Sequence, residues 1–317
     1  TTDGTGTAGG SIDLGEFGNN GLTNDEAGNG PRTHVASVSL DSTDTVTTGN
    51  ITLHEDVLLD RHGVNGGGDA AADFTVAGAA NVIISDDSAA PLAIDTEQNA
   101  DGAGGAINLG TGNVSADAVD LQLTLDATGD GSTGGEISFG PVNSTGGGQF
   151  LGAFSATTEG AANTTGRINL DNNISIDDAA ENGTSVTLSG RVEVSTDVTI
   201  DTENGGDDAG AGIDLSQATV FGNAPGHVVT LDATGNSGTD NQNVSLGAFD
   251  NDAGNASFIE DVDIDATNGG AGAAGDLVLN ASIQLDDNGA GQEASLTFNG
   301  GRVVVSADLT IDVSNDT

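Results

Sequence analysis

The chain has 317 residues, with 49 acidic residues, five arginines, no lysine and a formal net charge of −44. A chain with this charge repels nucleic acid and anionic membrane surfaces, so neither is an expected partner. The absence of cysteine excludes disulfides and cysteine-ligated metals. No apolar run approaches the roughly 18 residues that a membrane-spanning helix needs, so membrane insertion is not expected.

Short strands are predicted along the chain wherever pairs of apolar residues alternate with polar ones. Such pairs come in groups of three within about 20 residues, which is typical of one turn of a three-sided β-helix. The groups are Phe74/Val76, Val82/Ile84 and Leu92/Ile94, then Val186/Leu188, Val192/Val194 and Val198/Ile200, then Leu296/Phe298, Val303/Val305 and Leu309/Ile311. Almost no helix is expected, because 38 of the acids are aspartate, which favours turns.

The last strand of each group marks a long internal repeat. The closing strands PLAID, DVTID and DLTID end in the pairs Ile94-Asp95, Ile200-Asp201 and Ile311-Asp312, and their isoleucines lie 106 and 111 residues apart. The predicted units are residues 1–94, which are one coil short, then 95–200 and 201–311, with 312–317 starting a further repeat. Four coils are expected per full unit. Because the first residues, TTDGTGTAGGSIDLG, align with the loop after Ile94 or Ile200, a window on a longer repetitive protein is expected.

The fold class predicted from this spacing is an all-β parallel β-helix, a solenoid of about three long repeats. The alternative is a row of tandem β-sandwich domains, which have a similar period of about 100 residues. A sandwich normally has an anchoring aromatic core, whereas this chain has nine Phe, no Trp and no Tyr. The solenoid is therefore the preferred prediction.

An aspartate follows the last apolar residue of many predicted strands, and we call these residues the hinge acids. They are Asp95, Asp126, Asp177, Asp201, Asp232, Asp265, Asp286 and Asp312. If they stack along one edge at about 4.8 Å, they repel one another, since the spacing is inside the Debye length of roughly 8 Å. Two explanations fit: Ca²⁺ held between acidic corner loops by oxygen ligands, or a solvated acidic face in a saline environment. No cofactor is expected to be required, and Ca²⁺ is the one candidate ligand.

Catalytic residues are not predicted. The four histidines, His34, His54, His62 and His227, occupy non-equivalent places in the repeats and show no triad or metal-ligand spacing. Carboxylate pairs are abundant enough that a β-helix polysaccharide-degrading enzyme stays open as an alternative, although the chain has few aromatic or basic residues for substrate contacts.

Ten N-x-S/T sequons are candidate glycosylation sites. They lie at Asn50, Asn113, Asn143, Asn163, Asn173, Asn182, Asn243, Asn255, Asn280 and Asn315. Because Asn, Ser and Thr are frequent here, several sequons are expected by chance.

The alternating strand triplets with Gly, Asn and Asp corners resemble the β-strand-repeat segments of large secreted surface proteins, above all filamentous-haemagglutinin-like adhesins. The resemblance covers nearly the whole chain and implies a right-handed β-helix shaft at the cell surface. The expected function is a structural segment of an extracellular filament, sheath or cell-surface shaft, not an enzyme. Expected partners are copies of the chain or further repeats of it. An adhesin shaft or binding face that recognises glycans or surfaces is the alternative.

Overall fold

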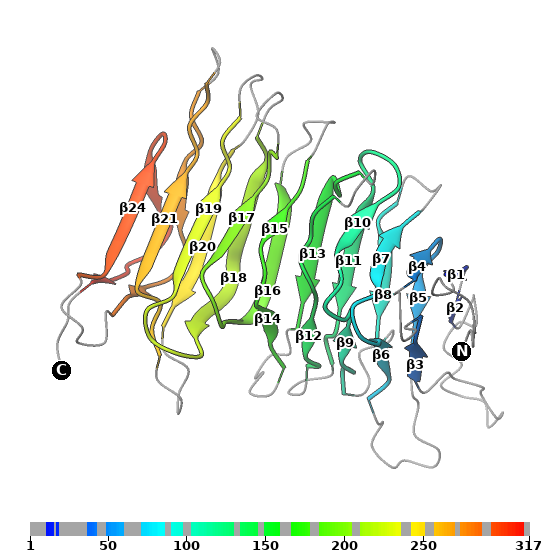
Figure 1. Ribbon diagram of the computed structural model, residues 1–317. Coiled ribbons are helices and arrows are strands. Elements are labelled where there is room, and N and C mark those ends of the chain that lie inside the picture. Colours follow the sequence, from blue (N-terminus) through cyan, green and yellow to red (C-terminus); the bar gives the residue numbers. More distant parts are fainter. Residues whose placement is uncertain are drawn as a thin grey trace, which may run out of the picture.

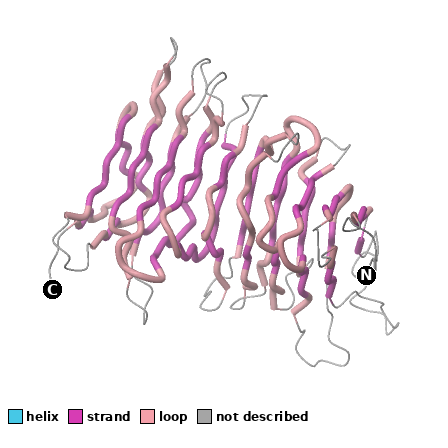
Figure 2. The backbone as a smooth tube through the Cα atoms, in the orientation of Figure 1, coloured by secondary structure: helices cyan, strands magenta, loops and turns pink. Residues whose placement is uncertain are grey.

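The protein is a parallel β-solenoid, in which the chain winds through successive coils that stack in sequence order (Figure 1). The computed structural model describes residues 11–15, 17–18, 37–42, 49–59, 71–85, 90–97, 103–129, 134–144, 149–158, 166–177, 184–204, 210–235, 242–250, 257–269, 273–286 and 293–313. Figure 2 shows strands and loops but no helix in these residues. Every pair of strands in the described ranges is parallel, which excludes the β-sandwich alternative, since sandwich sheets are antiparallel.

The coils have three faces. A 4-stranded and a 5-stranded sheet make face 1, and Val142 bridges them by pairing with Val114 and Ile174. The strands of face 1 are β1 (Ile12–Leu14), β4 (Asn50–Leu53), β7 (Asn81–Ile84), β10 (Val114–Ala116), β15 (Ile174–Ser175), β17 (Val198–Asp201), β19 (Val228–Asp232), β21 (Asp261–Asp265) and β24 (Ser295–Asn299).

A 17-stranded sheet forms the other two faces, because three of its strands bend round the corner between them. Those three are β16 (Thr184–Val194), β18 (Gly212–Gly222) and β20 (Val244–Phe249). Face 2 holds their first arms with β2 (Phe17–Gly18), β5 (Val57–Leu58), β8 (Leu92–Asp95), β11 (Gln122–Asp126), β13 (Ala153–Thr157), β22 (Leu277–Leu279) and β25 (Val303–Val305). Face 3 holds their second arms with β3 (Ser37–Leu40), β6 (Asp73–Val76), β9 (Ile107–Asn108), β12 (Ile137–Ser138), β14 (Ile168–Leu170), β23 (Ile283–Gln284) and β26 (Ile311–Asp312).

Inward-facing aliphatic side chains stack in register from coil to coil and form one continuous core. On face 1, for example, Ile51 pairs with Val82 and Val82 with Val114, and all three side chains have 0% of their surface exposed. In the second group of predicted strand pairs the side chains point inward as expected: Val186, Leu188 and Ile200 are at most 1% exposed. In the third group, Val303, Val305 and Ile311 are 53%, 55% and 47% exposed. Stacking of like on like lets short strands bury a narrow interior without large aromatic residues.

Glycine is required where the backbone of one coil passes close to the next. At the corner that enters face 3, a Cβ on Gly135 would lie 1.9 Å from the carbonyl oxygen of Gly105. A Cβ on Gly105 would in turn lie 1.9 Å from the carbonyl oxygen of Ala72. These distances are too short for any side chain, so the corner glycines permit the tight coil spacing.

The long sequence repeat does not contain four whole coils, so that prediction is wrong. The equivalent residues Ile94, Ile200 and Ile311 lie on face 2, face 1 and face 3 respectively. The chain passes through eleven strand positions between one closing strand and the next, which is three and two-thirds coils. After β8 these are β9, β10, β11, β12, Val142, β13, β14, β15, the two arms of β16, and β17.

The second full repeat follows the same course. From β17 it passes through the two arms of β18, β19, the two arms of β20, β21, β22, β23, β24, β25 and β26, which is again eleven positions. From β1 up to and including β8 the chain has eight strand positions. Each later repeat has eleven, and the three further positions make up one coil. Each repeat is therefore turned by two faces about the solenoid axis relative to the repeat before it.

Candidate functional site: the acidic corners

The hinge acids are built into the corners of the coils as hydrogen-bond acceptors. In five of them Oδ1 accepts a hydrogen bond from the backbone N–H two residues later, at 2.9 to 3.0 Å; these are Asp95, Asp126, Asp201, Asp232 and Asp265. Such an Asx turn reverses the backbone direction at the end of a strand. The aspartate thus has a structural role at these five corners. Asp214 makes the same contact with the N–H of Ser216, at 2.8 Å, and was not predicted.

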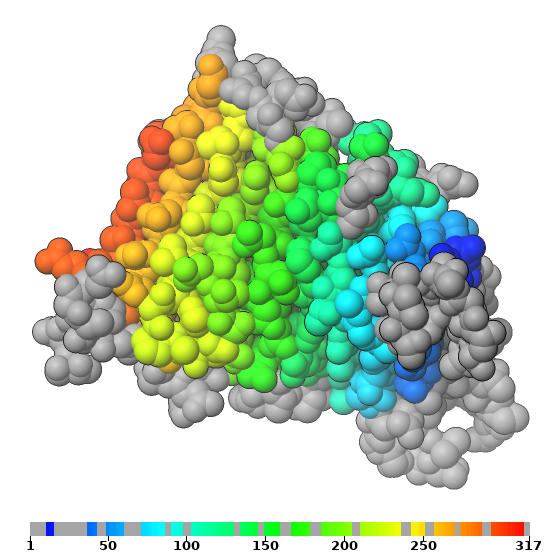
Figure 3. Space-filling model, in the orientation of Figure 1, coloured from blue at the N-terminus to red at the C-terminus, as the bar shows by residue number. Residues whose placement is uncertain are grey.

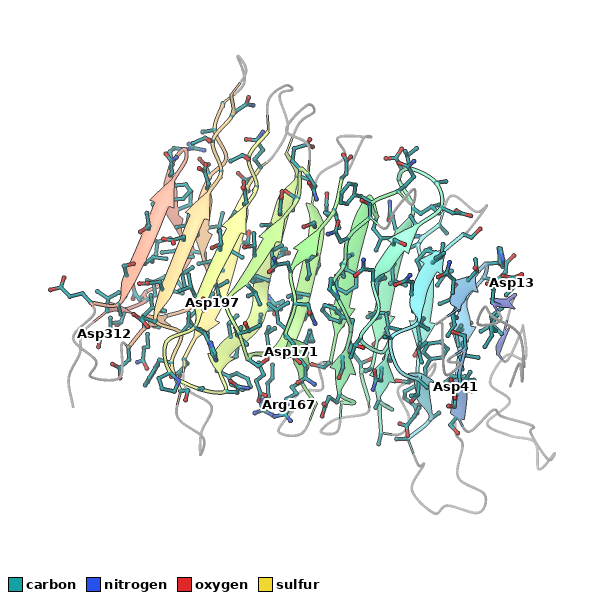
Figure 4. The ribbon with its side chains drawn as sticks, in the orientation of Figure 1. Asp13, Asp41, Arg167, Asp171, Asp197 and Asp312 are labelled. Atoms are coloured by element: carbon teal, nitrogen blue, oxygen red, sulfur yellow. The ribbon has the colours of Figure 1, made fainter. Side chains whose placement is uncertain are left out.

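The hinge acids do not form the single edge that was predicted. Asp95 stacks on Asp126 at the end of face 2, whereas Asp201, Asp232 and Asp265 stack at the end of face 1. The separation follows from the eleven-position repeat, which moves equivalent hinges to different faces. Of the remaining three, Asp177 bridges Glu203 next to the face 1 stack, and Asp286 and Asp312 lie on or beside face 3. Figure 4 shows Asp312 at one end of the molecule and Asp13 at the other.

The face 1 ladder, which consists of Asp201, Asp232 and Asp265, concentrates negative charge in adjacent coils about 4.8 Å apart. Burial raises the pKa of Asp201 above 3.8 and the charge of Asp232 raises it further, while the hydrogen bond from the N–H of Glu203 acts in the opposite direction. One coil beyond Asp265 the ladder continues with Asn299, whose Nδ2 donates to Oδ2 of Asp265 at 3.2 Å. A neutral donor therefore ends the run of carboxylates.

Threonine hydroxyls close the acidic loops at their bases. The Thr96 hydroxyl donates to the carbonyl of Gly105 at 2.9 Å, and the Thr202 hydroxyl donates to the carbonyl of Ala211 at 2.8 Å. The two threonines are equivalent in the repeat but lie at corners of different faces. Because the hydroxyl fixes both ends of the loop, the residues between them can vary in number without disturbing the coil.

Two glutamates are buried at the corners and were not predicted from the sequence. Glu97 is 3% exposed and Glu203 is 5% exposed, although glutamate is seldom buried. The sequence feature that could have indicated them is the tripeptide Asp-Thr-Glu, which occurs at the hinges of Asp95 and Asp201. The third equivalent hinge has Asp312-Val313-Ser314 instead.

Within the described ranges, no group of three or more His, Asp and Glu side chains is arranged to hold a metal ion. Calcium at the corners therefore stays a prediction. His54 and His227 are far apart in the fold: Nδ1 of His54 lies 3.1 Å from the carbonyl oxygen of Ser85, and Nε2 of His227 lies 3.1 Å from Oδ1 of Asn223. His34 and His62 lie outside the described residues.

Several sequon asparagines take part in contacts between coils. The side-chain oxygens of Asn173, Asn243 and Asn280 accept hydrogen bonds from the next coil, from Thr199 N, Asp276 N and Ser306 Oγ at 2.9, 2.7 and 3.0 Å. Oδ1 of Asn50 accepts from Asn81 at 3.3 Å. Asn113 and Asn143 are partly buried beside face 1, and Asn163, Asn182, Asn255 and Asn315 lie outside the described residues. Glycosylation stays a prediction at all ten positions.

The cationic side chains of the described residues pair with neighbouring coils. Arg167 lies between Glu193, at 2.6 Å, and Glu136, at 3.8 Å, and Figure 4 labels it in the middle of the molecule. Arg302 donates hydrogen bonds to both carboxylate oxygens of Asp276, from Nε to Oδ1 and from Nη2 to Oδ2, and this contact lowers the pKa of Asp276. These arginines therefore join one coil to the next and do not form a patch for an anionic ligand.

Comparison of the chain with protein-family models, with curated proteins and with solved structures gives no match. No described helix is long and apolar enough to cross a membrane.

Proposed function

We propose that the chain is a structural segment of an extracellular filament, sheath or cell-surface shaft. The observation that carries the proposal is the stack of coils around a single apolar core, with five hinge acids used as turn acceptors at the ends of faces 1 and 2. A stack of this kind supplies length and stiffness, because each coil is fixed by hydrogen bonds and side-chain packing to the coils beside it.

The charge of −44 supports a role in contact with solvent. Because the repeat turns by two faces, hinge acids occur at the ends of faces 1 and 2 and on or beside face 3. Such a surface keeps neighbouring shafts apart by repulsion and keeps the array soluble. Calcium or a high salt concentration would relieve the repulsion within each ladder.

Electron microscopy of native material tests the proposal. Thin fibres of uniform width are expected, and discrete globular particles would count against a shaft. A glycan array distinguishes the adhesin alternative: retention of a glycan that is lost on mutation of one corner loop would favour a binding face. Cleavage of a polysaccharide by the purified chain would favour the enzyme instead.

The calcium hypothesis has a separate test. Thermal unfolding is measured after EDTA treatment and again after addition of Ca²⁺. A rise in the midpoint that Mg²⁺ or an equal ionic strength of NaCl does not reproduce would support bound calcium. An unchanged midpoint would favour the solvated acidic face.

A further inference from the structure

Four of the sequons coincide with the start of a strand, and the strand pattern accounts for them. The asparagine begins or precedes the strand, the middle residue points inward, and the Ser or Thr follows on the outer side. The four middle residues are 0% exposed; they are Ile51, Val114, Ile174 and Val244. Because such sequons arise from the fold itself, a glycan acceptor must be distinguished by further features.

Exposure distinguishes Asn173 from the other sequon asparagines that the structure describes. Asn173 is exposed, whereas the others are partly buried: Asn50, Asn113, Asn143, Asn243 and Asn280. In the sequon of Asn113 the hydroxyl residue, Ser115, is only 1% exposed. An N-linked glycan is bulky and hydrated, so it is carried where the asparagine faces solvent.

The side-chain amide of Asn173 can be modified without loss of its contact with the next coil. Its Oδ1 accepts a hydrogen bond from the backbone N–H of Thr199 at 2.9 Å, and this contact joins the coils of β15 and β17. An N-linked glycan is attached through the amide nitrogen, Nδ2, and leaves the carbonyl oxygen in place. The hydrogen bond from Thr199 therefore persists in the glycosylated chain.

The corner that carries Asn173 is short on its own coil and on both neighbouring coils. Residues 171–173 join β14 to β15, residues 195–197 join β16 to β17 in the next coil, and residues 139–141 lie between β12 and the bridge at Val142 in the coil before. β15 pairs with β17 on one side and with Val142 on the other. Figure 3 shows this part of the chain, in green, in the middle of the molecule. The surroundings of Asn173 are thus set by coils on both sides, and these short corners leave room for a glycan.

An acidic residue precedes Asn173 at a second recognition position. Asp171 lies two residues before it, and none of the other nine sequons has Asp or Glu at that position. Bacterial oligosaccharyltransferases bind their acceptor through such an acid, since a carboxylate accepts a charge-assisted hydrogen bond from a basic side chain of the enzyme. Asp171 is exposed, and Figure 4 labels it in the middle of the molecule. Its Oδ1 accepts a hydrogen bond from the Ser195 hydroxyl, which orients the carboxylate at the surface.

We propose that Asn173 is the acceptor of an N-linked glycan. The inference rests on the proposed extracellular function, because the transfer takes place on exported protein. The donor is an oligosaccharide linked to a polyprenyl diphosphate. Nδ2 of Asn173 loses a proton and forms a bond to the anomeric carbon of the first sugar. The bond from that carbon to the diphosphate oxygen breaks, and the polyprenyl diphosphate leaves with the electron pair, so nothing is oxidised or reduced.

Mass spectrometry of native material is the direct test. Cleavage after Arg167 and Arg191 releases residues 168–191, which contain the sequons of Asn173 and Asn182. This peptide should be heavier than its sequence by the mass of one glycan, and its fragment ions should place the added mass on Asn173.

Variants of the full chain give the second test, in bacterial cells that export it together with an oligosaccharyltransferase and a lipid-linked oligosaccharide of known mass. The wild-type chain should gain one glycan. Ser175→Ala should abolish the gain although Asn173 and its contact with Thr199 stay in place, and Asp171→Asn should abolish it while keeping an oxygen for Ser195. Ser245→Ala, the same change in the sequon of Asn243, is the matched control and should leave the gain intact. Circular dichroism of each variant verifies that it folds.

Two outcomes overturn the proposal. One is an unmodified Asn173 in native material. The other is an unchanged gain of mass in Ser175→Ala, which would place the glycan on another residue. Electron microscopy separates this inference from the proposed function. Fibres with an unmodified Asn173 would leave the shaft standing, and globular particles with a glycan on Asn173 would leave the acceptor standing.

Discussion

The coils in the middle of the solenoid and its last coil have the same sequence pattern but different environments. Ile200 in β17 and Ile311 in β26 are repeat equivalents, yet Ile200 is 0% exposed and Ile311 is 47% exposed. Each makes the same kind of parallel pairing on one side. The difference shows that a coil owes its buried core to both of its neighbours, so the free energy of the array is largely interfacial.

The largest expected effect is a difference in the loss of unfolding free energy when each of these two isoleucines is replaced by alanine. Ile200→Ala should lower the free energy of unfolding by about 2–5 kcal/mol, because it leaves a cavity in a column closed on both sides. Ile311→Ala should cost less than about 1 kcal/mol in dilute protein, because the side chain is half exposed. Urea denaturation of the two variants gives the comparison. Equal losses would contradict the interfacial account.

Corner glycines supply the next effect. Gly135→Ala should destabilise the fold by about 1–3 kcal/mol, since its Cβ would lie 1.9 Å from the carbonyl oxygen of Gly105 and the backbone must shift. Gly15→Ala is the matched control, because no atom lies within 4 Å of its Cβ position. Its effect should stay within about 0.5 kcal/mol. Urea midpoints measure both, and a tolerated alanine at Gly135 would show that the coils can separate at this corner.

Much of the fold could be predicted from the sequence, because strand residues face the core by a period of two. The triplet ending at Ile200 was assigned correctly in all three strands, as was the triplet ending at Ile94. The face on which each strand lies could not be predicted. The motif that marks the repeat is an Asx turn, whose hydrogen bond is local and works at any corner. The face on which a motif lies depends only on the number of strand positions since the previous motif. That number is hard to read from the sequence, because some positions, such as the isolated bridge at Val142, have no clear strand pattern.

Five of the eight hinge acids named from the sequence form Asx turns, but the arrangement of the eight was not predicted. The hinge acids were found because aspartate recurs after an inward aliphatic residue, as at Ile94 and Ile200. Which face each hinge acid lies on depends on the number of strand positions between hinges. Because that number was not predicted, the division of the acids between faces was not predicted either. The buried Glu97 and Glu203 were missed because a charged residue in a loop is expected to be exposed.

A smaller effect separates the two roles of a hinge acid, turn acceptor and charge. Asp232→Ala removes the acceptor for the N–H of Thr234, whereas Asp232→Asn keeps an oxygen there and removes only the charge. The alanine variant should be less stable than the asparagine variant by about 0.5–1.5 kcal/mol. Urea denaturation at neutral pH measures the difference. Equal stabilities would show that the hydrogen bond contributes nothing to the corner.

The smallest expected effect concerns pH and Asp201. Its pKa in the folded protein is raised above 3.8 by burial and by Asp232, so its charged form is disfavoured in the fold. The contribution of Asp201 to stability should therefore fall as pH rises from about 3.8 through the raised pKa, and its destabilising effect is complete above that value. Asp201→Asn should be more stable than wild type at pH 7, by less than about 1 kcal/mol because the carboxyl is partly exposed. The advantage should vanish below about pH 4, where the aspartate is protonated in both states. Urea midpoints of the two proteins between pH 4 and 7 test the sign. If Asp201→Asn were instead less stable than wild type at pH 7, with a deficit that disappears on acidification, the ladder would stabilise the charged form, as a bound cation would.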